Sequence, residues 1–106
     1  MGKNGDERAI LDYDYNMIAG KVLKEKRQSK EYSLDTLSNK MNNLVSKQAL
    51  SRYEKGEARI KNNVFLAICY ALNYEPIDVF TEIGERYFKY LEDNMQDILQ
   101  RIEDNK

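Results

Sequence analysis

The fold of this 106-residue chain is decided by one stretch, Ser46-Lys47-Gln48-Ala49-Leu50-Ser51-Arg52-Tyr53-Glu54-Lys55-Gly56. Ser46 can begin a helix, because its hydroxyl can accept a hydrogen bond from a backbone N–H two or three residues later. Gly56 can end that helix, because the left-handed backbone conformation needed there costs glycine nothing. Three residues between them share a narrow apolar stripe, namely Ala49, Leu50 and Tyr53. The stretch therefore predicts a short capped helix with one face on a hydrophobic core.

The other face of this helix is polar, rich in hydrogen-bond donors and free of acidic residues. It consists of Lys47, Gln48, Ser51, Arg52 and Lys55. A glutamine can pair with adenine through two hydrogen bonds, and arginine or lysine can pair with guanine or with phosphate. Taken alone, the face has two interpretations: a surface that reads DNA, or the solvated side of an ordinary surface helix. The rest of the chain decides between them.

The composition is that of a small soluble globular domain. The 106 residues suffice for one core, and 42% hydrophobic with 33% charged residues is ordinary for this class. No apolar run approaches the roughly 18 residues of a membrane span, and no signal peptide is recognisable, so we expect no membrane contact. The single cysteine, Cys69, excludes an internal disulfide and fits a reducing cytosol. We therefore expect a cytoplasmic protein.

The residues of common catalytic sites are missing. With no histidine and one cysteine, the usual zinc sites and nucleophile–base pairs cannot form. The carboxylates, lysines and tyrosines stand in no recognisable catalytic spacing. The sequence therefore predicts no enzyme activity, no metal and no cofactor.

The charges are segregated along the chain. From Asn16 to Lys61 the net charge is +6, whereas the remaining residues carry a net charge of −7. A basic middle between acidic ends is what a surface facing a polyanion would look like on an otherwise acidic protein. Chance clustering on a small chain is the alternative.

Two helices are predicted before the capped one. The first runs from Asn16, as its N-cap, to about Lys30, after an extension at residues 1–15 that we expect to be partly flexible. The residues do not decide whether the apolar positions near Tyr13 begin a further helical turn or lie against the domain. Ser33 opens the second helix. Its apolar face is Leu34, Leu37 and Met41, after which Asn42-Asn43 predicts a turn.

Three helices are predicted after Gly56. Asn62 or Asn63 caps the fourth, in which Cys69 is expected to be a small core residue. Pro76 fits the first position of a short fifth helix that ends near Phe80. A last helix is predicted from 82 to 103. Its apolar stripe is Ile83, Tyr87, Tyr90, Leu91, Met95, Ile98, Leu99 and Ile102. This stripe either folds back onto the domain or pairs with another copy.

From Gly20 to Phe80 this series resembles the helix-turn-helix family of Cro and the lambdoid phage repressors, the xenobiotic-response-element-type regulators. The resemblance rests on many residues at consistent spacing. They are Gly20, Leu23 and Arg27 in the first helix, Ser33, Leu37 and Lys40 in the second, Val45-Ser46-Lys47-Gln48 at the start of the third, and Ser51-Arg52-Tyr53-Glu54-Lys55-Gly56 at its end. The resemblance implies an all-α fold, a five-helix lambda-repressor-like DNA-binding domain over residues 16–80. The apolar stripe beyond it predicts an additional C-terminal amphipathic helix at 81–106 for dimerisation or partner docking.

The resemblance also implies roles for individual residues. The expected base contacts are Lys47, Gln48, Ser51 and Arg52, with Gln48 and Arg52 the principal readers and Lys47 also placed to bind phosphate. The expected contacts to the DNA backbone are Thr36, Lys55, Arg59 and Lys61. Arg27 and Glu54 match a structural ion pair that orients the recognition helix. The expected dimer or partner interface is Ile83, Tyr87, Leu91, Met95, Ile98 and Ile102.

This chain departs from the family pattern in the turn before the recognition helix. The segment Asn42-Asn43-Leu44-Val45 is about two residues longer than the usual glycine-containing turn, which could tilt that helix. Leu34 stands where a phosphate-contacting glutamine is common, so one anchor to the backbone is missing.

The resemblance implies a sequence-specific double-stranded DNA-binding transcriptional regulator, a repressor of the phage or mobile-element type that occupies its operator as a homodimer. A second reading keeps the fold and makes protein binding the function. The C-terminal helix would then dock a toxin, an antirepressor or another regulator, as in antitoxins that regulate their own expression.

Overall fold

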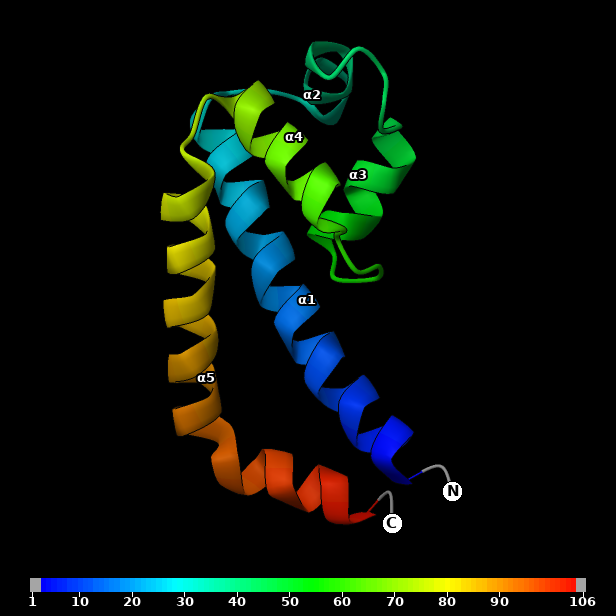
Figure 1. Ribbon diagram of the computed structural model, residues 1–106, viewed down its shortest axis with the longest axis vertical. Helices are drawn as coiled ribbons and strands as arrows, with labels where there is room; N and C mark the ends of the chain where they lie inside the picture. The colour runs from blue at the N-terminus through cyan, green and yellow to red at the C-terminus, as the bar shows by residue number, and fades with distance from the viewer. Residues whose placement is uncertain (1–2, 105–106) are drawn as a thin grey trace.

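The computed structural model describes residues 3–104, with side chains from residue 11 onward. These residues form five helices and no strand: α1 (Lys3–Ser29), α2 (Leu34–Lys40), α3 (Lys47–Glu54), α4 (Asn62–Leu72) and α5 (Pro76–Asp104). The two long helices α1 and α5 run along the length of the molecule, and the three short helices gather at one end (Figure 1). The predicted all-α fold is confirmed.

The hydrophobic core lies where the short helices meet the two long ones. Its most deeply buried apolar side chains come from all five helices: Val22, Leu37, Leu50, Ile68, Leu72, Val79 and Ile83. Cys69 is also buried in this cluster, and burial raises the pKa of its thiol to about 11. Cys69 is therefore the small core residue that the sequence predicted.

The local signals predicted most helix ends correctly. The hydroxyls of Ser33 and Ser46 accept hydrogen bonds from the N–H groups of Thr36 and Ala49, at 3.0 and 3.1 Å. Gly56 adopts the left-handed conformation with φ of 74°, and α5 begins at Pro76. These four positions are set by contacts within one turn of chain, which a local pattern can report.

Two predicted helix starts are wrong. Asn16 lies inside α1, which already begins at Lys3. The N-cap of α4 is Lys61, which makes no side-chain capping hydrogen bond, while Asn62 is already helical. In both cases a residue that can cap a helix is available but is not used.

The turn between α2 and α3 uses the two predicted asparagines. Asn42 and Asn43 both have left-handed backbones, with φ of 55° and 59°. The hydroxyl of Ser38 donates to the carbonyl of Val45 at 2.8 Å and is buried. The hydrogen bond from Ser38 to Val45 therefore holds the end of this turn against α2.

Helix α5 does not end near Phe80 as predicted. Its buried side continues from Val79 to Ile83, so the short fifth helix and the C-terminal helix are one element. The interruption comes instead at Asn94, whose backbone is non-helical (φ −121°, ψ 16°). The Asn94 side-chain amide donates to the carbonyl of Tyr90 at 2.9 Å, which satisfies a backbone acceptor next to the kink.

The C-terminal helix folds back onto α1. Below the kink, the segment of α5 at residues 95–104 turns toward the N-terminal half of α1 (Figure 1). Arg101 in this segment donates to the carboxylate of Asp14 in α1 at 2.9 Å. Above the kink, the rings of Tyr15 and Tyr87 meet edge to face with centroids 5.2 Å apart.

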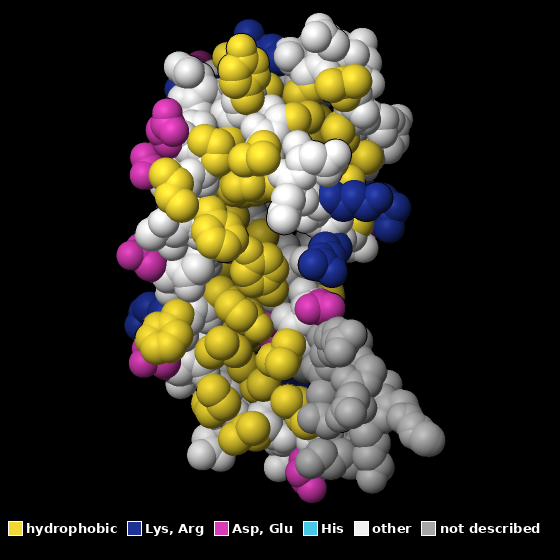
Figure 2. Space-filling model, in the orientation of Figure 1, with side chains coloured by type: hydrophobic (Ala, Val, Ile, Leu, Met, Phe, Trp, Pro, Cys, Tyr) yellow, Lys and Arg dark blue, Asp and Glu magenta, His cyan; other side chains and the backbone are white. Residues whose placement is uncertain are grey.

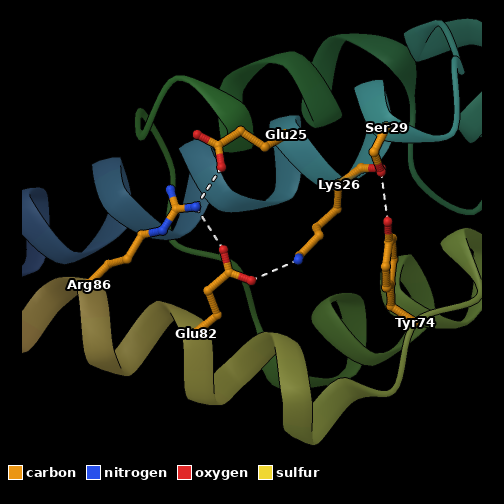
Figure 3. Close-up of polar contacts among 6 residues, drawn as sticks. All are labelled: Glu25, Lys26, Ser29, Tyr74, Glu82 and Arg86. Carbon is orange, nitrogen blue, oxygen red and sulfur yellow. Dashed lines mark hydrogen bonds and ion pairs between the residues drawn. The ribbon is translucent and has the colours of Figure 1, made fainter.

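A polar network also joins α1 to the upper part of α5 (Figure 3). One Arg86 nitrogen bonds both Glu25 and Glu82 at 2.7 Å, and Lys26 pairs with the second oxygen of Glu82 at 2.7 Å. The Lys26 ammonium also lies 5.1 Å from the centre of the Tyr74 ring. These contacts hold α5 against the basic half of α1.

Removing the charge of Glu82 should destabilise the protein more at neutral pH than in acid. The pKa of Glu82 is lowered from its ordinary 4.5, chiefly by the hydrogen bond from Lys26. A lowered pKa means that the stabilisation is present above pH 4.5 and is lost as pH falls through the folded value. We expect Glu82→Gln to lower the free energy of unfolding at pH 7 by about 0.5–1 kcal/mol, the range of partly exposed pairs. Urea titrations at pH 7 and pH 3 should show a smaller loss at pH 3 than at pH 7.

Candidate nucleic-acid interface

Helix α3 presents the polar face that the sequence predicted. Leu50 is buried against the core, and Tyr53 packs against it. The opposite side leaves Lys47, Gln48, Arg52 and Lys55 exposed and Ser51 half-buried. The structure therefore brings all four predicted base contacts together on one short helix, with the predicted phosphate contact Lys55 at its C-cap.

A buried ion pair fixes α3 on α1. The guanidinium of Arg27 donates to both carboxylate oxygens of Glu54, at 2.7 and 2.8 Å, and to the carbonyl of Tyr32 at 2.7 Å. Both side chains are about one-tenth exposed, and the hydrogen bond to Glu54 raises the pKa of Arg27. This two-pronged geometry restricts rotation of α3 about its axis, and so sets the direction in which Gln48 and Arg52 point.

The close approach of α1 and α3 depends on Gly20. A Cβ on Gly20 would lie 2.2 Å from the carbonyl oxygen of Tyr53 and 2.7 Å from that of Glu54. Only a residue without a side chain allows this contact between backbones. Gly20 and the Arg27–Glu54 pair therefore act together to position α3.

The predicted DNA-backbone contacts come from different elements. Thr36 lies in the first turn of α2, where its hydroxyl is 2.9 Å from that of Ser33. Arg59 and Lys61 are exposed in the connection between α3 and α4. Arg59 also lines a hollow of 520 Å³ together with Tyr15, Phe65 and Phe80.

An acidic neighbour of Lys47 was missed by sequence reasoning. The carboxylate of Asp35 in α2 lies 3.5 Å from the Lys47 ammonium, and both side chains are at least half exposed. The charge of Lys47 is thus partly offset in the free protein. No sequence signal joins these residues, because the contact arises only when the turn places α2 beside α3.

The predicted interface residues of α5 divide between the inside and the outside of the molecule. Ile83 and Ile98 are 1% and 2% exposed and therefore belong to the monomer's interior. Tyr87, Leu91 and Ile102 are half-buried, and Met95 is exposed. Phe80 and Phe88, which were not among the predicted interface residues, are more exposed than any of these.

Neither a metal-holding cluster nor a membrane-spanning helix is found among the described residues. Between residues 11 and 104 no group of three His, Cys, Asp or Glu side chains is arranged to hold a metal ion. No helix in the described part of the chain has the length and apolarity needed to span a membrane.

Comparison with known proteins agrees with this geometry. The family model described as helix-turn-helix matches residues 23–79, more than half of the 106 residues. No curated protein and no solved structure matches the chain significantly. The match covers the end of α1, all of α2, α3 and α4, and the first turn of α5. The chain belongs to the helix-turn-helix family of Cro and lambda repressor-like regulators, which bind DNA.

Proposed function

We propose that this protein is a sequence-specific repressor that occupies a two-fold operator as a homodimer, with α3 in the major groove. The proposal rests on one observation: Gln48 and Arg52 are exposed on a helix whose orientation is fixed by the buried Arg27–Glu54 pair. In this mode of binding the N-terminal part of the recognition helix meets base edges, and the preceding helix crosses the backbone. Half-sites then lie roughly 34 Å apart.

The residues of α3 divide by chemistry into readers and anchors. The amide of Gln48 can bond adenine at two positions, and the guanidinium of Arg52 can bond guanine at two positions. Lys55 follows the last turn of α3 and, with Arg59 and Lys61, would neutralise phosphates, which sets the position of the protein without reading sequence. Thr36 would contribute a hydroxyl to the same backbone.

The second candidate function is capture of a protein partner by α5. It is favoured by the exposed aromatic Phe88, which is 63% exposed on this helix. Truncation after Glu82 would not test it, because Ile83 and Ile98 are buried and their loss would damage the fold. Point substitutions on the exposed side of α5 are the appropriate probe. Loss of partner capture with unchanged DNA binding would support this function.

The experiment is selection from a pool of random duplex DNA, followed by binding measurements across salt concentration. We expect enrichment of a palindromic site and an association constant whose logarithm falls linearly as the logarithm of the salt concentration rises. Weak, sequence-independent binding at low salt would contradict the proposal and direct attention to the protein-binding function.

Replacing Gln48 or Arg52 with alanine should relax specificity at one base step each. The loss of a pair of hydrogen bonds to a base corresponds to about 1–3 kcal/mol of discrimination. Lys55→Ala, at the C-cap of the same helix, is the matched control, because loss of a phosphate contact should weaken binding to all sequences and reduce the salt slope. Fluorescence anisotropy on the selected site and on single-base variants of it measures both effects. Uniform weakening by all three variants would argue against base reading by Gln48 and Arg52.

A further inference from the structure

A hollow of 520 Å³ opens where the connection between α3 and α4 meets the two long helices. Small-molecule sites in proteins commonly enclose roughly 300–1,000 Å³, so this volume suits a small organic ligand. Figure 2 shows hydrophobic side chains gathered on the face that α4 and α5 share, with Lys and Arg side chains beside them. The lining of the hollow includes Tyr15 and Asn16 of α1, Arg59 of the connection, Asn62 and Phe65 of α4, and Phe80 of α5.

The walls of the hollow are aromatic and are held in place by packing. The rings of Phe65 and Phe80 meet edge to face with centroids 6.5 Å apart. The Tyr15 ring is held in the same way by the ring of Tyr87, at 5.2 Å. Phe80 is nevertheless 55% exposed, so part of its ring surface is free for a further contact. Because aromatic rings favour edge-to-face or offset contact with another ring, the walls suit the flat body of an aromatic ligand.

The polar side chains of the lining have no partners within the described chain. Between residues 11 and 104 no side-chain hydrogen bond is formed by Tyr15, Asn16, Arg59 or Asn62. Arg59 is exposed and forms no ion pair in that part of the chain either. Burial raises the pKa of Tyr15, so its hydroxyl remains a hydrogen-bond donor at neutral pH. A concave site with a few available polar groups among apolar walls is the usual form of a ligand pocket.

The charges of the lining select which aromatic ligand fits. Arg59 is the only cation among the described lining residues, and a guanidinium binds a carboxylate through two parallel hydrogen bonds. The amides of Asn16 and Asn62 supply further donors. Asp12 also lines the hollow and would repel a second negative charge on the ligand. The lining therefore suits a molecule that carries one carboxylate on an aromatic body.

We propose that this hollow binds a small aromatic monocarboxylate, with the carboxylate on Arg59 and the ring against Phe65 and Phe80, and that the bound ligand weakens operator binding. The regulatory part rests on the proposed function, in which Arg59 contacts a DNA phosphate. A guanidinium that holds a carboxylate in the hollow does not neutralise a phosphate at the same time. Ligand and DNA therefore compete for Arg59, and each lowers the affinity for the other by the same factor.

Ligand binding is tested first on the full chain without DNA. Amide chemical shifts are followed by NMR during titration with indole-3-acetate and, separately, with its neutral analogue indole-3-acetamide. We expect a dissociation constant of about 0.1–1 mM for indole-3-acetate, with the largest shift changes around Arg59 and Phe65. The amide should bind about tenfold more weakly, because it lacks the charge that Arg59 pairs with. Absence of saturable binding, or equal affinity for the two ligands, would overturn the proposal.

Three variants test the roles of the lining residues. Arg59→Gln should lower the affinity for indole-3-acetate about tenfold and leave that for the amide nearly unchanged. Phe80→Ala should weaken both ligands alike, because it removes part of the wall. Lys24→Gln is the matched control for a lost positive charge, since Lys24 is exposed on α1 and lies outside the lining. Thermal unfolding verifies that each variant folds. An equal loss of both ligands in Arg59→Gln would contradict the pairing of Arg59 with the carboxylate.

The regulatory part is tested by fluorescence anisotropy on the selected operator. Saturating indole-3-acetate should weaken DNA binding about tenfold and reduce the salt slope by about 1, the effect of one lost phosphate contact. Sodium acetate at the same concentration controls for ionic strength, and Arg59→Gln should bind DNA more weakly and no longer respond to the ligand. Unchanged DNA affinity at saturating ligand would overturn the regulatory part. If no operator is selected at all, the proposed function and this regulation both fail, whereas NMR binding to the free chain would still support the ligand site.

Discussion

Replacing Gly20 with alanine should lower the free energy of unfolding by about 3 kcal/mol, at the upper end of the usual cost of overpacking. The new Cβ would stand 2.2 Å from the Tyr53 carbonyl oxygen, a backbone atom that cannot rotate away. Helix α3 must therefore move off α1, which also lengthens the hydrogen bonds of 2.7 and 2.8 Å between Arg27 and Glu54. For a domain of this size the melting temperature should fall by roughly 10–20 °C.

The matched control is the same substitution at Gly84, in the other long helix. No atom lies within 4 Å of a Cβ there, and at concentrations where the chain is monomeric Gly84→Ala should stabilise it by about 0.5–1 kcal/mol. Urea unfolding of both variants measures the difference. Gly20→Ala should also weaken operator binding in the folded fraction, because α3 is displaced. An unchanged midpoint for Gly20→Ala would show that α1 and α3 are not in backbone contact.

The sequence was sufficient to predict the parts of the fold that are set within a few residues. Ser33 and Ser46 cap helices with their own hydroxyls, and Gly56 ends α3 by its backbone freedom. The polar face of α3 follows from spacing alone. Spacing does not say what kind of molecule the domain binds. The match to the helix-turn-helix family adds that the domain carrying this face binds DNA.

Long-range contacts could not be predicted in the same way. Asp14 and Arg101 are 87 residues apart, and Asp14 stands in an acidic run that has the composition of a solvated extension. The contact of Asp35 with Lys47 depends on the path of the turn at 42–45. The break at Asn94 has no glycine or proline to signal it. Each of these features exists only because distant segments pack together.

The periodicity of α5 could not decide between folding back and pairing, because the helix packs on α1 and still leaves part of its apolar side exposed. Ile83 and Ile98 face inward, whereas Phe80 and Phe88 do not. A single wide apolar stripe in the sequence is thus divided by α1 into a buried part and an exposed part. The sequence does not show which apolar residues of α5 are buried and which are exposed; the structure does.

Arg101→Met should destabilise the chain by about 3 kcal/mol, the lower end of the cost of leaving a buried charge without its partner. Asp14 is only 1% exposed, and Arg101 bonds its carboxylate at 2.9 Å and also lies 3.4 Å from the Tyr90 hydroxyl. With Arg101 gone, the Asp14 charge draws water into the contact between α1 and the segment at 95–104. Faster amide exchange confined first to residues 95–104 should accompany the lower unfolding free energy.

A double-mutant cycle separates the ion pair from ordinary packing. Asp14→Asn removes the charge that Arg101 neutralises, so Asp14→Asn with Arg101→Met should be more stable than the sum of the single losses predicts, by roughly 1–3 kcal/mol. Lys89→Met is the control, because the Lys89–Asp93 pair lies on the same helix at 3.4 Å but is mostly exposed, and its loss should change stability by less than about 0.5 kcal/mol. Additive losses at Asp14 and Arg101 would mean that the segment at 95–104 is held by Ile98 and its apolar neighbours alone. A coupled loss would make the Asp14–Arg101 pair the contact that holds the C-terminal segment on α1.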